Sequence, residues 1–351
     1  MLSQLFDDTA ERMRSNMRRI YALLIVGNVG AWLWALIEFH SQPLLLGMAF
    51  LAYSFGLRHA FDADHIAAID NVTRKLMQEG RRPIAVGFFF SLGHSTGVLG
   101  LIVIIALTAS ALQGYFDALK DVGGFIGTSV SALFLFAIAT VNIVVLGQVY
   151  RAFQTVKAGG RLVEADIHDI LAKRGFLART FRPVFQLIEC SWHMYPLGLL
   201  FGLGFDTATE VGLLGMSAMQ AAQGLSIWSI LVFPALFTAG MSLMDTAGST
   251  LMVGAYGWAF VKPMRKLYYN MTVTFVSVIA ALVVGGIEAL GLIAYRLGLG
   301  GPFWDFIAML NDNFGLFGYG IVAFFIACWL ISFVIYKAKG FDRIEVSAAR
   351  T

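Results

Sequence analysis

Long runs of apolar residues alternate along the chain with short polar segments. Each run approaches or exceeds the roughly 20 residues that a helix needs to cross a hydrocarbon layer about 30 Å thick. Backbone amides in hydrocarbon must be paired within their own segment, and no alternating pattern typical of a β-barrel occurs, so we expect helices. The eight predicted spans are 20–38, 43–69, 83–112, 123–149, 194–219, 228–258, 271–295 and 314–336.

Composition places most of the protein surface in lipid. Hydrophobic residues make up 58% of the 351 residues, charged residues make up 13%, and the mean hydropathy is +0.74. Soluble domains are about one quarter charged, so this composition disfavours an ordinary soluble enzyme, a disordered regulator and a nucleic-acid-binding protein. Cys190 and Cys328 are far apart and predict neither a disulfide framework nor a paired-cysteine metal site.

The distribution of Lys and Arg predicts the orientation of the spans. With a cytoplasmic N-terminus, 22 of the 25 Lys and Arg residues fall in cytoplasmic segments, including Arg74 and Lys75 after the second span. The opposite side holds Lys120 and Arg296, and Arg58 lies inside a span. By the positive-inside rule, both termini are expected in the cytoplasm. The net charge of +3 therefore reflects loops and does not indicate binding to nucleic acid.

The spans predict two membrane halves, 1–149 and 194–351, joined by the cytoplasmic segment 150–193. Apolar residues of this segment fall near helical spacing, so we expect an amphipathic connector near the lipid headgroups. A regulatory domain is the alternative for this segment. The apolar residues in question are Leu162, Ile167, Ile170 and Leu171.

Ionisable residues inside the predicted spans are concentrated on four of the eight helices. Each such residue costs about 2.5–3.5 kcal/mol at the bilayer centre, so each requires a reason. Their grouping predicts a hydrophilic site inside the bundle. The candidate metal-binding residues are His59, Asp62, Asp64, His65, His94, Asp206, Glu210 and Asp245.

Helical geometry predicts which of these residues share a face in the second span. At 100° per residue, His59, Asp62 and His65 form a stripe that steps about 60° each time. Asp64 points to the opposite side, toward Arg58 or a neighbouring helix. We expect the stripe to face the interior site.

The fifth span contributes oxygen donors to the same prediction. Asp206 and Glu210 are four residues apart and share a face, with Thr209 beside them. Neutral imidazoles and carboxylates together suit nickel, cobalt, zinc or iron(II). The spans carry neither a thiolate cluster for copper(I) nor an all-oxygen cage for calcium or magnesium.

An alternative interpretation assigns these residues to hydrogen bonds between helices. Arg58 then pairs with Asp64, and Asp206 pairs with Thr246 or Ser242. This alternative stays open for any single residue, whereas the grouping of the whole set favours a shared site.

Further polar residues are accessory candidates. Asn28 is flanked by small residues that permit close packing toward the site. His193 lies at the edge of the fifth span. It is either a ligand at the entry to the site or an interfacial residue without function, and the sequence leaves both alternatives open. The complete accessory set is Asn28, Arg58, Ser95, Thr209 and His193.

A weak internal repeat favours a transport mechanism. The sequence Phe-Gly-Leu occurs at 55–57 and again at 201–203, and the pattern Phe-x-x-Gly-x-Ser occurs at 90–95 and 237–242. The predicted topology runs the second and fifth spans in opposite directions, so the copies form an inverted repeat. Inverted repeats with a polar site near the midplane are typical of alternating-access carriers.

Four sequence blocks resemble the nickel/cobalt transporter (NiCoT) family of bacterial permeases. They are 58–66, which contains the pattern HxxxxDH, and 90–96, 203–210 and 240–246. The resemblance implies uptake of nickel(II), cobalt(II) or both across the bacterial cytoplasmic (inner) membrane, through a multi-pass protein of eight helices. By motif position it implies essential roles for His59, Asp64 and His65, and site roles for His94, Asp206, Glu210 and Asp245.

The expected function is therefore secondary uptake of a transition-metal cation, with the cation as substrate and no resident cofactor. No GxxxxGK[ST] motif occurs, so no ATPase activity is expected. Efflux is an alternative, but the cytoplasmic loop has only His168, and an exporter is expected to carry a histidine-rich loop. A membrane metalloenzyme is the alternative from another class, and it is disfavoured because neither HxxHH nor HExxH is present.

Overall fold

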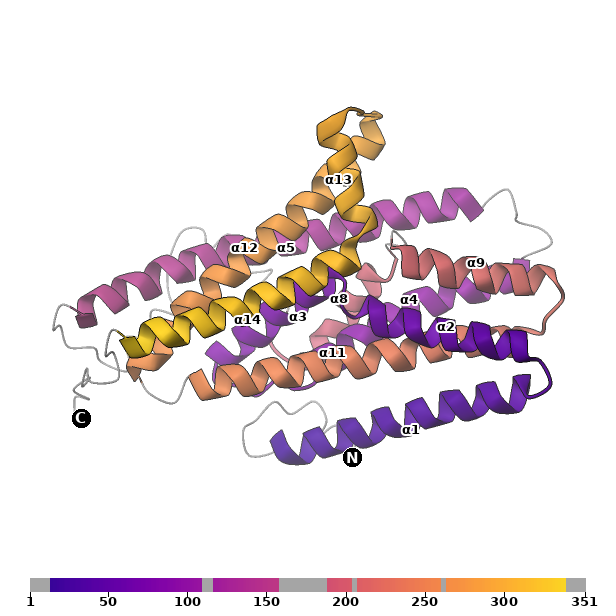
Figure 1. Ribbon diagram of the computed structural model, residues 1–351, viewed down its shortest axis with the longest axis horizontal. Helices are drawn as coiled ribbons and strands as arrows, with labels where there is room; N and C mark the ends of the chain where they lie inside the picture. Colours follow the sequence, from indigo (N-terminus) through magenta and orange to yellow (C-terminus); the bar gives the residue numbers. More distant parts are fainter. Residues whose placement is uncertain (1–12, 109–115, 158–187, 204–206, 260–262, 339–351) are drawn as a thin grey trace.

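The computed structural model describes residues 13–108, 116–157, 188–203, 207–259 and 263–338 (Figure 1). Every regular element in these ranges is helical, which confirms the predicted all-helical class. The elements are α1 (Met13–Phe39), α2 (Pro43–His59), α3 (Ala63–Gln78), α4 (Val86–Thr108), α5 (Phe116–Lys157), the 3-10 helix η2 (Ser191–His193), α8 (Met194–Phe201), α9 (Ala208–Ala222), α10 (Ile227–Ile230), α11 (Val232–Ala259), α12 (Pro263–Leu297), α13 (Pro302–Asp312) and α14 (Phe314–Ala338).

Among the described residues, six helical segments are long and apolar enough to cross a membrane, or up to seven if the bent pair α2 and α3 is one span. On α1 and α14, less than one fifth of the most apolar window is buried, so these helices present apolar surface outward, as lipid contact requires. The protein is thus an integral membrane protein. Eight spans stay a prediction, because the fifth predicted span, 194–219, is divided between α8 and α9.

The second predicted span, 43–69, is not one helix. α2 ends at His59, α3 begins at Ala63 and continues to Gln78, and the two helices are bent by 50°. Asp62 has extended backbone angles (φ −65°, ψ 145°) at the N-cap of α3, a position that Asp favours over the helix interior. The predicted stripe of His59, Asp62 and His65 on one continuous helix is therefore wrong.

The fifth predicted span is also interrupted. α8 ends at Phe201, and α9 begins at Ala208 after the N-cap residue Thr207, whose hydroxyl accepts the backbone N–H of Glu210. Asp206 lies outside the described residues. In both copies of the predicted repeat the span is therefore divided into two half-helices, α2 and α3 in the first copy and α8 and α9 in the second.

Three further differences concern helices outside the two breaks. α12 begins at Pro263, eight residues before the predicted span, and α13 was not predicted. α5 continues to Lys157, so it takes in the start of the predicted connector 150–193. The connector's predicted amphipathic helix, with Leu162, Ile167, Ile170 and Leu171, lies outside the described residues.

Glycines allow the half-helices of one copy to approach the other copy closely. A Cβ on Gly56 of α2 would overlap the carbonyl oxygen of Phe237 in α11, and a Cβ on Gly202 after α8 would overlap the carbonyl oxygen of His94 in α4. α2 of the first copy therefore packs against α11 of the second, and α8 of the second copy packs against α4 of the first. In this way the two copies interlock around the breaks.

This close packing predicts a large effect of a single added methyl group. Gly56→Ala is expected to lower the free energy of unfolding by about 1–3 kcal/mol, because the new Cβ must displace the backbone of α11. Gly27→Ala is the matched control, since a Cβ at Gly27 in α1 meets nothing within 4 Å. Thermal denaturation of the detergent-solubilised variants measures both effects, and equal melting temperatures would contradict the close approach.

The last helix supports the break between α2 and α3 from outside the repeat. A Cβ on Gly318 of α14 would overlap the carbonyl oxygen of Phe61, and the rings of Phe61 and Tyr319 lie 4.8 Å apart. α5 and α14 end at the left of Figure 1, and α1 begins on the same side of the bundle but closer to the middle of the view. The cytoplasmic location of this side stays a prediction.

The prediction that Arg74 and Lys75 lie in a loop after the second span is wrong. Both lie in α3 and are buried, with 1% and 8% of their surface exposed. The apolar core beside them joins α3, α4, α5, α8, α12 and α14, while a second core joins α1, α2, α4, α9 and α11. The break between α2 and α3 separates a helix of one core from a helix of the other.

Candidate metal site

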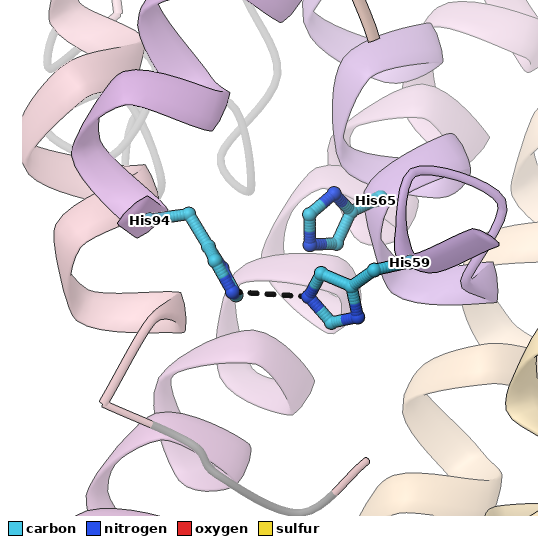
Figure 2. Close-up of side chains that lie close together, drawn as sticks. All are labelled: His59, His65 and His94. Carbon is cyan, nitrogen blue, oxygen red and sulfur yellow. Dashed lines mark hydrogen bonds between the residues drawn. The ribbon is translucent and has the colours of Figure 1, made fainter. Parts of the chain in front are cut away.

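Three histidines from three helices meet at the break between α2 and α3. His59 is the last residue of α2, His65 lies in the first turn of α3, and His94 lies in α4 (Figure 2). Each of these residues is at most 2% exposed. Each offers a ring nitrogen, and these three atoms lie within 4.8 Å of one another. Two nitrogens on one cation at about 2.1 Å can lie at most about 4.2 Å apart, so a small movement of the rings would bring all three imidazoles onto a single cation.

The closest pair of ring nitrogens joins α2 to α4. His59 Nε2 and His94 Nε2 are 3.0 Å apart, as the dashed line in Figure 2 marks. Two nitrogens that bind one cation at about 2.1 Å and at right angles lie roughly 3.0 Å apart. The observed separation fits a shared cation as well as a hydrogen bond between the rings.

Two of the imidazoles contact carboxylates through their Nδ1 atoms. His59 Nδ1 lies 2.7 Å from Asp62 Oδ2, and His65 Nδ1 lies 3.3 Å from Asp245 Oδ2 of α11. A carboxylate that accepts the Nδ1–H bond fixes the ring orientation and leaves the Nε2 lone pair for a metal. Asp62 and Asp245 thus contact the histidines from the side away from Nε2.

Glu210 of α9 occupies a different position in the site. Its Oε1 lies 2.9 Å from His94 Nε2 and 3.8 Å from His59 Nε2. Thr207 donates a hydrogen bond to the other oxygen, Oε2, at 3.0 Å. A buried carboxylate oxygen of Glu210 therefore lies beside the Nε2 atoms of both His59 and His94. In this position it can bind a cation directly.

Two threonines of the second copy contact the first copy. Thr209 Oγ1 lies 3.1 Å and Thr207 Oγ1 lies 3.4 Å from His59 Nδ1. The sequence prediction included Thr209 and missed Thr207. The signal was present, because Thr207-x-x-Glu210 has the spacing of a capping box at a helix start.

Several buried polar atoms of the site lack a hydrogen-bond partner among the described residues. They are His65 Nε2, His94 Nδ1 and one carboxylate oxygen of Asp245. Buried polar atoms are nearly always satisfied, because desolvation without a partner is costly. Imidazole nitrogens and carboxylate oxygens with unused lone pairs are the donors that nickel(II) and cobalt(II) accept.

Two phenylalanines form apolar walls beside the histidines. The ring of Phe90 lies 4.8 Å from that of His65, and the ring of Phe237 lies 5.4 Å from that of His59. These phenylalanines occupy equivalent positions in the two repeat copies. Low polarity around the site strengthens electrostatic attraction between a cation and the carboxylates.

The structure places some predicted residues away from the histidines. Asn28 donates to the carbonyls of Leu24 and Ala239 and accepts from Tyr53, so it joins α1, α2 and α11 and does not reach the site. His193 Nδ1 accepts the backbone N–H of Glu189.

Three other predicted residues lie in the same three helices as the histidines. Arg58 is exposed, and Ser95 is buried beside His94 in α4. Asp64 is partly buried in the first turn of α3 and interacts electrostatically with His94. Thr246, offered above as a partner of Asp206, donates its hydroxyl to Ser242 in its own helix.

Comparisons with known proteins agree on one family. A family described as "High-affinity nickel-transport protein" matches residues 45–335. The chain is 60% identical to the "High-affinity nickel transport protein" of Cupriavidus necator over 96% of both chains. It is 45% identical to "Nickel transporter NicT" of Mycobacterium tuberculosis over 93% of this chain and 89% of the relative.

A further relative carries a different metal in its name. The chain is 43% identical to "Cobalt transport protein NhlF" of Rhodococcus rhodochrous over 81% of both chains. No solved structure matches the chain. The relatives are transporters, so the metalloenzyme alternative is excluded.

Proposed function

The chain belongs to the high-affinity nickel-transport family, and from this premise we propose that it carries nickel(II), cobalt(II) or both into the cell across the cytoplasmic membrane. The cation is the substrate, and no resident cofactor is needed. We assign eight spans, with α2–α3 and α8–α9 each crossing the bilayer once and both termini in the cytoplasm. Names of relatives that mention nickel and cobalt support this substrate pair.

The convergence of three buried imidazoles and Glu210 carries the proposal. The cation binds His59 Nε2, His94 Nε2 and Glu210 Oε1, with His65 as the third imidazole. Asp62 and Asp245 orient the rings, and Asp64 and Asp206 remain proposed ligands. Binding requires neutral imidazoles and ionised carboxylates, so protons leave the site as the metal arrives.

The burial of the site supports alternating access. The three histidines are closed to solvent on all sides in this conformation, so a cation inside them is occluded. Broken spans with a binding site at the break are typical of carriers in which one repeat moves against the other. We propose that relative movement of the interlocked copies opens the site to one side of the membrane at a time.

Uptake of radioactive nickel tests the proposed function. Cells that lack their own nickel importers are expected to accumulate more nickel when they express the chain. Excess cobalt is expected to suppress this accumulation, and manganese is expected to suppress it less, because manganese binds such ligands more weakly. Lower nickel content in expressing cells would indicate efflux and overturn the proposed direction.

A further inference from the structure

Beyond His65, α3 buries a polar face that the metal site does not use. Asp70, Asn71, Thr73 and Arg74 are each at most 1% exposed. Burial of a charged group is unfavourable unless partners compensate it. The partners of this face come from three other helices, so they show what holds α3 in place.

Asp70 is bound from two helices at once. Tyr256 of α11 donates its hydroxyl to Asp70 Oδ1, and Ser277 of α12 donates to Asp70 Oδ2 at 2.5 Å. A hydrogen bond to an ionised carboxylate is stronger than one between neutral groups. Asp70 therefore ties α3 to both α11 and α12.

Arg74 and Asn71 extend these connections. Arg74 donates to Thr274 of α12 at 3.0 Å and to Asn71 at 2.8 Å. Asn142 of α5 donates to the same oxygen of Asn71 at 2.7 Å. We refer to Asp70, Asn71, Arg74 and the side chains bonded to them as the α3 network. The network holds α3 against α5, α11 and α12.

The other half-helix of the same span is packed differently. The buried positions of α2 before His59 are Leu45, Ala49, Ala52 and Gly56, which are apolar or small. Exposure of these residues to water is unfavourable. Polar groups of the α3 network, in contrast, can exchange their protein partners for water at little net cost. Of these two half-helices, α3 is therefore the one suited to line a water-filled passage.

We propose that the α3 network is the inner gate of the transporter. In the conformation described here its hydrogen bonds keep α3 closed over the inward side of the histidines. Release of the cation requires these bonds to break, after which the same polar side chains line the exit passage. This inference rests on the proposed function and orientation, because it places the end of α3 on the cytoplasmic side.

Cysteine accessibility tests the gate without a transport assay. A Thr73→Cys reporter is introduced into the full chain after Cys190→Ser and Cys328→Ser, and a charged methanethiosulfonate reagent is applied to inside-out membrane vesicles. Tyr256→Phe or Ser277→Ala removes one donor to Asp70 and leaves the buried charges balanced. Each is expected to raise the rate of reporter labelling about tenfold, the effect of one hydrogen bond to a charged group.

Two controls separate gate opening from general loosening. Ser131→Ala removes a comparable buried donor, to Glu288 at 2.8 Å between α5 and α12, and is expected to leave the labelling rate unchanged. An Ala52→Cys reporter in α2 is expected to stay unreactive in every variant. Size-exclusion chromatography of the solubilised protein checks that each variant remains folded.

Three results would overturn the gate. They are unchanged labelling of the Thr73→Cys reporter, an equal rise at the Ala52→Cys reporter, and labelling from the opposite face of the membrane alone. Failure of the proposed function is distinguishable, because it would appear as absent nickel uptake by the unmodified chain alongside normal gate opening in the labelling assay.

Discussion

Replacing His59 by alanine is expected to abolish nickel accumulation. Among the described residues, His59 alone contacts His94 through one ring nitrogen, Nε2, and the carboxylate of Asp62 through the other, Nδ1. Loss of a group that merely orients a metal ligand already costs about 10–100-fold in affinity or activity. Loss of the ligand itself is therefore expected to lower nickel uptake by at least about 100-fold, measured as the initial rate at low nickel concentration.

His40→Ala is the matched control for this substitution. His40 is exposed after α1, and its Nδ1 contacts only the backbone carbonyl of Ile37 among the described residues. Its removal is expected to leave the uptake rate within about twofold, as for a surface substitution with little effect on stability. Normal uptake by a folded His59→Ala variant would remove His59 from the site.

Conversion of Glu210 to glutamine is expected to have the second-largest effect. Glu210 is the carboxylate that faces the Nε2 atoms of His59 and His94, and the substitution keeps its size while removing the negative charge. A buried cation then loses the electrostatic attraction of the carboxylate that faces both Nε2 atoms. We expect the nickel concentration for half-maximal uptake to rise by at least about 100-fold, beyond what an orienting group contributes.

Asp62→Asn makes the same chemical change on the other side of His59. An amide oxygen can still accept the Nδ1–H bond, so the ring keeps its orientation and loses only part of its basicity. The expected rise in half-maximal concentration is about 10–100-fold. If Asp62→Asn were the more damaging change, the cation would lie on the Nδ1 side, and the assignment of Glu210 as the direct ligand would be wrong.

The membrane helices were predictable because hydrocarbon imposes a length on each of them. Where a helix continues past the hydrocarbon, hydropathy gives no signal. α12 begins at Pro263 because the helix continues through the largely polar segment 265–270, ahead of the apolar run. Hydropathy indicates where a segment is buried in lipid, whereas hydrogen bonding determines where the helix ends.

The breaks in the second and fifth spans were harder to predict. Asp62 interrupts the first of them, but its side chain contacts His59 and makes no capping bond, so the local sequence shows no complete cap. At the second break, Thr207 and Glu210 do form a recognisable helix start. A span length of about 20 residues conceals such a break, because two half-helices have the same total hydropathy as one helix.

The candidate site was predictable as a set of residues but not as an arrangement. The cost of burying charge in lipid identifies the histidines and carboxylates from the sequence. The different positions of Glu210 and Asp245 around the rings depend on how α9 and α11 pack against α2 and α3. Likewise the sequence places Arg74 in a loop, because its hydrogen-bond partners Thr274 and Asn71 are not apparent in a local hydropathy window.

The paired breaks also determine the backbone electrostatics around the histidines. α2 and α8 direct their carbonyl ends toward the breaks, and α3 and α9 direct their amide ends there. Carbonyl ends attract a cation and amide ends repel it, each by about 0.3–1 kcal/mol and more when buried. These contributions oppose one another when all four ends are close. Movement of any one of these helices would therefore change the balance of backbone charge around the cation, in addition to moving the side chains that the helix carries.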